Sequence, residues 1–170
     1  MFEKIELRTK LKKISMVNAD YTQKVIDNLQ NVIKDKVVCT YIPLENELNI
    51  NMHLKGHSVL ATTCHQEGEM QICIYDGPLE KNIFNVFQPI DLKIINNVDI
   101  FLVPGIGFDQ KGTRLGRGRG IYDQLLSQHL NATFIGITDK EHLVNEIPSE
   151  SHDIKMHILI THDKFIEVDL

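Results

Sequence analysis

The chain is poor in cysteine, and the cysteines it has show no pairing pattern. There are three, an odd number with no CxxC spacing, which does not fit a disulfide framework or a zinc site. Two of them lie in apolar runs, where a free cysteine behaves as a small hydrophobic residue. We therefore expect Cys39, Cys64 and Cys73 to be free core thiols in a reducing compartment rather than redox or metal ligands.

Long apolar segments and positive net charge are also missing. No apolar stretch approaches the length of a membrane span, and four of the first eight residues are charged, where a signal peptide would be apolar. The formal net charge is -5, whereas a general nucleic-acid binder gains affinity by neutralising phosphates. We expect a cytoplasmic monomer that binds neither nucleic acid nor membranes.

Arginine is scarce, yet it is concentrated in one place. Residues 105–120 hold three of the four arginines and six of the ten glycines. At about 7 Å, each pair among Arg114, Arg117 and Arg119 costs roughly 0.6 to 2.4 kcal/mol, so the cluster favours a nearby anion. Glycine permits close backbone approach, and the guanidinium group matches phosphate oxygens. An apolar run precedes this segment and a helical pattern follows it, which suits a polyphosphate site.

The spacing of these glycines does not identify a reaction. No Gly-Lys-Ser/Thr follows them, so the segment is not a Walker A loop, and it is not the GxGxxG dinucleotide pattern. Two alternatives to a polyphosphate site are a plain surface turn and an arginine-glycine tail that binds nucleic acid. A single copy between a strand and a helix argues against the tail.

Strand and helix patterns alternate along the chain. Helices are expected at 2–14, after a cap at Asp20, at 50–54, at 120–130 with Leu130 on its apolar face, and weakly near Glu141. Strands are expected at 36–42, 57–63, 70–75, 98–103, 133–138 and 156–161, with an edge strand at 165–168. This order predicts a Rossmann-like α/β fold: a single three-layer domain over residues 1–170 with a mostly parallel central sheet.

Ligands of such sheets bind beyond the carboxyl ends of the strands. Three segments bring polar groups to strand ends, namely 43–47, 105–120 and 151–153. The second lies within VPGIGFDQKGTRLGRGRGIYD (103–123), a string that closely resembles the signature of the 5-formyltetrahydrofolate cyclo-ligase family. The resemblance extends over nearly the whole chain. Its other parts are Lys4-x-x-x-Arg8, a strand followed by Glu47, FNVFQP (84–89) and HDIKMHILIT (152–161).

The resemblance implies an enzyme that converts 5-formyltetrahydrofolate to 5,10-methenyltetrahydrofolate with ATP and Mg²⁺, releasing ADP and phosphate. In that reaction the formyl oxygen is phosphorylated and N10 of the folate then attacks the formyl carbon. The protein's task is mainly positioning and charge stabilisation.

For the nucleotide, the resemblance implies a surface made from two parts of the chain. Lys4 and Arg8 match positions that reach the ATP phosphates, although alone they suit a solvated basic helix. The matching ATP-binding segment is Arg114, Leu115, Gly116, Arg117, Gly118, Arg119, Gly120, Ile121 and Tyr122.

Carboxylates complete the implied site. Asp123 and Asp153 match magnesium-binding positions, which fits a hard cation held by one or two carboxylates and phosphate oxygens. Taken alone, each suits a helix first turn or a cap. Ile42 and Glu47 match substrate contacts, and Glu47, Arg114 and Tyr122 are the implied catalytic residues. By spacing, His152, His157 and His162 fit no metal pattern and are interpreted as structural.

The chain departs from the family pattern at three places. Ile121 replaces the first of two tyrosines and removes an aromatic ring, Arg119 replaces a lysine or glycine, and residues 62–64 stand where a proline is common. Two other functions explain part of the pattern: a phosphate-ligand sensor that lost catalysis, and an acyl- or sugar-phosphate enzyme on a similar fold. A sensor is less favoured because it would need no paired carboxylates around a nucleotide. The other enzyme is less favoured because it leaves Lys4, Arg8 and Glu47 unexplained.

Overall fold

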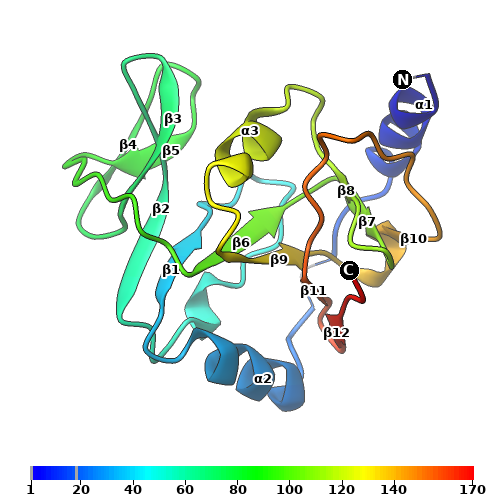
Figure 1. Ribbon diagram of the computed structural model, residues 1–170, viewed down its shortest axis with the longest axis horizontal. Coiled ribbons are helices and arrows are strands. Elements are labelled where there is room, and N and C mark those ends of the chain that lie inside the picture. Colours follow the sequence, from blue (N-terminus) through cyan, green and yellow to red (C-terminus); the bar gives the residue numbers. More distant parts are fainter. Residues whose placement is uncertain (1, 18) are drawn as a thin grey trace.

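The computed structural model describes residues 2–17 and 19–170, and its centre is a seven-stranded sheet (Figure 1). Its strands are β1 (Val37–Thr40), β2 (Val59–Gln66), β3 (Glu69–Ile74), β6 (Ile100–Pro104), β9 (Thr133–Ile137), β11 (Ile158–Ile160) and β12 (Phe165–Glu167). They lie in the order β12-β11-β9-β6-β1-β2-β3, and only the two edge strands, β3 and β12, run antiparallel to their neighbours.

Helices cover both faces of this sheet. Figure 1 shows α2 (Gln23–Ile33) on one side of the central strands and α3 (Ile121–Ser127) on the other. Alternate strand residues face opposite sides, so Val38 and Leu102 pack in the cluster of α2 while Cys39 and Phe101 pack in that of α3. This confirms the expected three-layer α/β fold with a mostly parallel sheet.

The strand order reverses between β1 and β6. From β1 the chain proceeds to β2 and β3 on one side, and it then returns through β6 to β9 and β11 on the other. In a doubly wound sheet, segments that leave two such strands diverge and open a crevice at their carboxyl ends. The segments that begin at Tyr41 and Gly105 are the two that diverge here.

The arginine-rich segment is more ordered than the open loop expected from its sequence. Its first half is an antiparallel pair, β7 (Gly107–Asp109) and β8 (Arg114–Leu115), to which β10 (Leu143–Val144) adds a parallel strand. Fully buried Asp109 fixes this pair, because its carboxylate accepts the backbone N–H groups of Lys111, Thr113 and Ile147. The sequence also did not predict a hairpin of β4 (Leu79–Lys81) and β5 (Phe87–Pro89).

The helix ends differ from those expected. The first helix, α1, is Phe2–Leu11 rather than 2–14. Thr22, not Asp20, occupies the N-cap position of α2, because its N–H donates to the His162 carbonyl and fixes the chain there. The helix α3 ends at Ser127 because the chain then turns toward β9, which leaves Leu130 exposed instead of on an apolar face. The short helices at 50–54 and near Glu141 are 3-10 turns, η1 (Asn51–His53) and η2 (Lys140–His142).

Two further expectations concern the chain as a whole. Cys39, Cys64 and Cys73 are free and buried, as expected. No helix in the described part of the chain is long and apolar enough to cross a membrane.

Candidate active site

A cleft of about 810 Å³ lies beyond the carboxyl ends of β1 and β6, at the reversal of strand order. Its lining comes from α1, the segment after β1, strands β2 and β3, the β4–β5 hairpin, the segment from β8 to α3, and residues 150–153. The site residues expected from the sequence that line it are Lys4, Arg8, Ile42, Glu47, Arg114, Gly116, Arg117, Gly118, Arg119, Gly120, Ile121, Tyr122, Asp123 and Asp153.

Leu115 is the exception among the expected site residues. Its side chain is fully buried in a cluster with Leu11, Ile106 and Ile147, away from the cleft. The reason is the period of a strand: in β8, Arg114 turns toward the cleft and the next residue turns to the opposite side. Leu115 therefore holds the segment in place and does not contact a ligand through its side chain.

One side of the cleft carries an excess of positive charge, although the protein as a whole is acidic. We call Lys4, Arg8, Arg114, Arg117 and Arg119 the basic wall. With Lys12 they place six cations around the cleft, against the carboxylates of Glu47, Asp123, Glu150 and Asp153. Such a local excess attracts a polyanion.

Arg114 is the most firmly held member of the basic wall. Its side chain is only 6% exposed, and Nη2 lies 3.0 Å from Oδ2 of Asp123. Its guanidinium carbon lies 5.2 Å from the centre of the Tyr122 ring. A Cβ at position 116 would lie 2.7 Å from Nη1 of Arg114, so any larger residue there would displace the guanidinium group. The guanidinium group is thus set in position before any ligand binds.

Arg117 joins the arginine-rich segment to the segment that follows β1. Its Nη2 donates to Oδ1 of Asn46 at 2.9 Å and lies 3.2 Å from Oε1 of Glu47. The other oxygen of Glu47 accepts the Leu44 N–H at 3.1 Å, which orients the carboxylate. The anion that the arginine cluster favours is therefore supplied in part by the protein itself. Exposed Arg119 has no such partner among the described residues.

The helix α1 brings two cations to the same wall. Nζ of Lys4 lies 2.7 Å from Oδ2 of Asp153, and Nε of Arg8 donates to the Gly116 carbonyl at 2.8 Å. Burial alone would raise the pKa of Asp153, but hydrogen bonds from Lys4 and the Glu150 N–H outweigh it and hold that pKa below its usual value. Lys4 is buried, so the solvated basic helix does not describe this residue.

The opposite side of the cleft is apolar. We call Met70, Phe84, Val86 and Phe87 the hairpin wall, since three of the four belong to the β4–β5 hairpin. Phe84 and Phe87 are 48% and 45% exposed. The hairpin is attached to β2 through Gln88, whose Oε1 accepts the His65 N–H at 3.0 Å.

His65 extends the hairpin wall toward β2. Its ring centre lies 4.7 Å from that of Phe84, and burial lowers the pKa of His65. A neutral imidazole beside a phenyl ring is a surface for an aromatic ligand. Sequence reasoning missed this wall, and the only signal for it was the pair of phenylalanines in FNVFQP at 84–89.

The residues from the end of β1 and the start of α3 lie between the two walls. Ile42 follows β1, and Ile121 and Tyr122 begin α3. Burial raises the pKa of the Tyr122 phenol well above its usual value, so the hydroxyl is a neutral donor near neutral pH. At the helix start Gly120 has a φ of 66°, a left-handed conformation that favours glycine.

The carboxylates of the cleft can supply only some of the ligands that a hard cation needs. The described residues contain no group of three or more His, Cys, Asp or Glu placed to bind a metal. Asp123 and Asp153 do line one cleft, each beside a cation of the basic wall. Because Mg²⁺ is usually held by one or two carboxylates together with phosphate oxygens and water, these residues fit a magnesium ion that shares its ligands with a bound phosphate.

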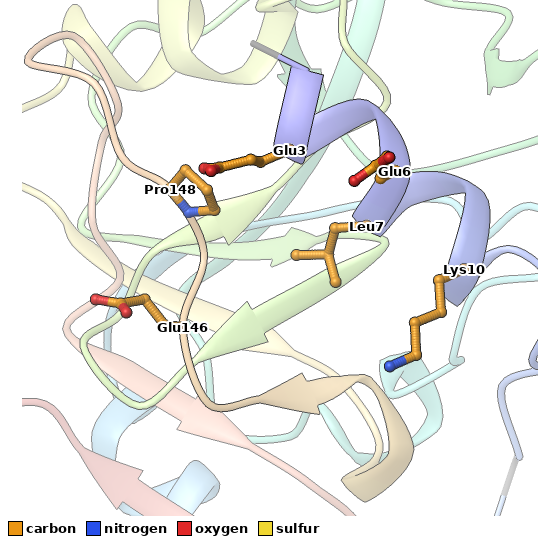
Figure 2. A pocket seen from close by; sticks show the side chains of 6 residues that line it. All are labelled: Glu3, Glu6, Leu7, Lys10, Glu146 and Pro148. Carbon is orange, nitrogen blue, oxygen red and sulfur yellow. The ribbon is translucent and has the colours of Figure 1, made fainter.

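A second hollow, of about 610 Å³, lies on another side of α1 (Figure 2). Figure 2 shows Glu3, Glu6, Leu7 and Lys10 on the helix and Glu146 and Pro148 on the facing segment. The Glu146 carboxylate is already paired with Lys111: Nζ of Lys111 lies 2.7 Å from Oε1 of Glu146. With three carboxylates and one lysine, this hollow does not favour an anionic ligand.

A family model and individual known proteins point to the same family. The sequence model of the 5-formyltetrahydrofolate cyclo-ligase family matches residues 3–162. The 5-formyltetrahydrofolate cyclo-ligase of Mycolicibacterium smegmatis is 30% identical over 75% of this chain and 74% of its own length. That of Haemophilus influenzae is 24% identical over 89% and 93%.

Solved structures agree with these sequences. The NMR structure of 5,10-methenyltetrahydrofolate synthetase from Aquifex aeolicus superposes with a TM-score of 0.79 at 28% identity, covering 97% of this chain and 92% of that one. The synthetase from Mycoplasma pneumoniae superposes with a TM-score of 0.71 at 19% identity, covering 93% and 98%, and supports the fold alone.

Proposed function

The chain belongs to the 5-formyltetrahydrofolate cyclo-ligase family, and from this premise we propose that it converts 5-formyltetrahydrofolate to 5,10-methenyltetrahydrofolate using ATP and Mg²⁺. The observation that carries the proposal is the pairing of two unlike walls in one cleft. The basic wall suits a polyphosphate, and the hairpin wall suits the aromatic rings of a folate.

The reaction needs a good leaving group on the formyl carbon. A bond forms between N10 and that carbon, the bond from carbon to the formyl oxygen breaks, and N10 loses its proton. ATP supplies the phosphoryl group with which the oxygen leaves as phosphate, alongside ADP. The protein's contribution is to hold the reacting groups in position and to balance the charge that develops.

The basic wall binds the phosphates in this proposal. Arg114 presents a fixed guanidinium fork, and Lys4 and Arg8 approach from α1. Because these cations already have partners, phosphate binding exchanges one set of charge-assisted contacts for another. Arg117 and Arg119, which are more exposed, contribute at the rim.

Asp123 and Asp153 hold magnesium in this proposal. When bound there, Mg²⁺ would neutralise phosphate charge. Arg114 and Lys4, the partners of these two carboxylates, line the same cleft and would face the phosphates beside the metal.

Glu47 and Ile42 face the folate in this proposal. The carboxylate of Glu47 is oriented by the Leu44 N–H and by Arg117, and it accepts the proton that N10 loses. Tyr122, neutral and packed on Arg114, supports the guanidinium group and donates from its hydroxyl. We also propose that residues 1–170 act as one domain, because Lys4 and Asp153 meet in the cleft from distant parts of the chain.

One assay tests the function. The purified protein is mixed with 5-formyltetrahydrofolate, Mg²⁺ and ATP, and the absorbance of the methenyl product is followed. Product that appears only when ATP and Mg²⁺ are both present supports the proposal. Nucleotide binding without product indicates a sensor, and turnover of a different phosphorylated substrate alone indicates another enzyme of the same fold.

A further inference from the structure

A buried histidine lies at the end of the helix that carries Lys4 and Arg8. His142, in η2, is 1% exposed. Its Nδ1 lies 2.7 Å from Oδ1 of Asp139, and its Nε2 lies 3.3 Å from the carbonyl oxygen of Leu11. Both neighbours are acceptors, and a neutral imidazole has only one N–H to offer them. The geometry therefore fits an imidazolium that donates from both nitrogens.

The Asp139 carboxylate joins this histidine to the chain that follows α1. Oδ1 also accepts the His142 N–H at 2.9 Å, and Oδ2 accepts the Val17 N–H at 3.0 Å. Leu11 is the last residue of α1, and its carbonyl, which has no i+4 partner in the helix, accepts the Ile14 N–H at 3.0 Å as well as facing the His142 ring. A cation beside such a carbonyl is favourable because the helix dipole is negative at that end.

The end of α1 is also packed against the arginine-rich segment. The side chain of Leu11 lies in one cluster with Ile106 and Leu115. A Cβ at position 107 would lie 2.7 Å from Cδ1 of Leu11 and 3.0 Å from the carbonyl oxygen of His142, so β7 is in close contact with both. A shift of this helix end moves Lys4 and Arg8 relative to Arg114.

We propose that His142 is a positioning residue for the basic wall: its imidazolium, held by Asp139, fixes the carboxyl end of α1 so that Lys4 and Arg8 face the cleft. When the ring loses its proton, one nitrogen presents a lone pair to an oxygen, and the helix end is released. The part of this inference that concerns ATP binding rests on the proposed function.

The surroundings of the His142–Asp139 pair determine how its contribution to stability changes with pH. Burial disfavours the imidazolium, but hydrogen bonding and charge from Asp139 outweigh burial and raise the pKa of His142 above its usual 6.5. The contribution to stability is therefore complete below that value and is lost as pH rises through the raised pKa. The pKa of Asp139 is held low because its hydrogen bonds and His142 outweigh its own burial.

The other ionisable groups packed around the pair are a phenol and a carboxylate. Tyr21, from the segment before α2, has a pKa raised to about 12 by burial and by the charge of Asp139. From α1 and its end, the carbonyls of Leu11 and Ile14 face the ring. On β7, the Asp109 carboxylate is occupied by backbone N–H groups. Of these described groups, His142 is the one whose usual pKa of 6.5 lies near neutral pH.

The test compares the protein with the His142→Gln variant from about pH 6 to about pH 9. In the unchanged protein, the KM for ATP should rise on the order of five-fold across the titration of His142, with kcat and the KM for folate little changed. The variant should have the higher ATP KM at every pH. The control is His162→Gln, a partly exposed residue between β11 and β12 that lies outside the cleft, and this variant should keep the original profile.

Two measurements on the unchanged protein keep the inference testable if the variant misfolds or ATP does not bind. NMR titration of the His142 Cε1–H signal should give a pKa above 6.5. Hydrogen exchange of the α1 amides, corrected for the intrinsic rate, should accelerate as pH passes that pKa. A His142 pKa at or below 6.5, or α1 protection that does not change with pH, overturns the inference. If both results hold but ATP does not bind, the proposed function fails and the positioning role stands.

Discussion

The two walls of the cleft are prepared for their ligands in opposite ways. The side chain of Arg114 on the basic wall is 6% exposed and paired with Asp123, whereas Phe84 on the hairpin wall is 48% exposed. A buried charge needs a partner whether or not a ligand is present, so Arg114 and Lys4 of the basic wall are held by carboxylates of the protein itself. An apolar ring can remain in water until a ligand covers it, and it then contributes by losing exposed surface.

The largest effect should come from Asp123→Asn, which removes both a proposed magnesium ligand and the partner of Arg114. We expect kcat to fall on the order of 100-fold, because charge on the transferred phosphoryl group is then poorly balanced. Calorimetry should also show weaker Mg²⁺ binding in the presence of ATP. The matched control is Asp76→Asn, which breaks an exposed pair with Lys93 outside the cleft. Unchanged turnover at saturating Mg²⁺ would exclude Asp123 from the site.

The next effect distinguishes members of the basic wall. Arg114→Ala should weaken ATP binding by about 1.5 to 3 kcal/mol, the scale of a hydrogen bond to a charged group. Arg119→Ala should have a smaller effect, because Arg119 is exposed and solvent competes with its contacts. Calorimetric titration with ATP measures both. Lys111→Ala, at a surface pair with Glu146, serves as control. Equal ATP affinity in all three variants would show that the phosphates lie elsewhere.

The sequence was most informative about the wall that is continuous in the chain. Arg114, Arg117 and Asp123 lie within one glycine-rich segment, so their proximity in space follows from their proximity in sequence. The same closeness does not reveal that the Leu115 side chain turns away from the cleft, since a strand of two residues directs neighbouring side chains to opposite sides. Sequence pattern alone does not show which residue of a motif faces the ligand.

The hairpin wall and the His142 contact could not be predicted for two physical reasons. Strands β4 and β5 have three residues each, too few to show a period of two, and their aromatic residues are exposed rather than buried. His142 meets the Leu11 carbonyl across 131 residues of sequence, and only the packing of η2 against α1 brings them together. The central strands, by contrast, were predictable because they are continuous apolar runs, and both covering helices were predictable because their apolar residues recur at helical spacing.

A smaller effect should separate the two walls. Phe84→Ala should raise the KM for 5-formyltetrahydrofolate roughly two- to twelve-fold, which corresponds to about 0.5 to 1.5 kcal/mol for an aromatic contact, with the ATP KM unchanged. Steady-state kinetics with each substrate varied in turn gives both values. Neighbouring Ile83 is more exposed and does not line the cleft, so Ile83→Ala is the control. A rise in the ATP KM alone would place the nucleotide on the hairpin wall.

The smallest effect concerns Ile121, between the walls. Ile121→Tyr should lower the KM for 5-formyltetrahydrofolate by about two-fold, near 0.5 kcal/mol, if the added ring packs against the folate. The ATP KM should not change. If folate affinity falls instead, the site has packed around isoleucine and the larger ring overfills it. Ile121 would then be a packing residue of this cleft.

The most direct test of the two-wall account is a crystal structure with a non-hydrolysable ATP analogue, Mg²⁺ and 5-formyltetrahydrofolate bound together. The account predicts phosphate oxygens within hydrogen-bond distance of Arg114 and Lys4, and folate rings in contact with Phe84 and Phe87. It also predicts Mg²⁺ in contact with the Asp123 carboxylate. Phosphates on the hairpin wall, or a folate that contacts only the basic wall, would contradict it.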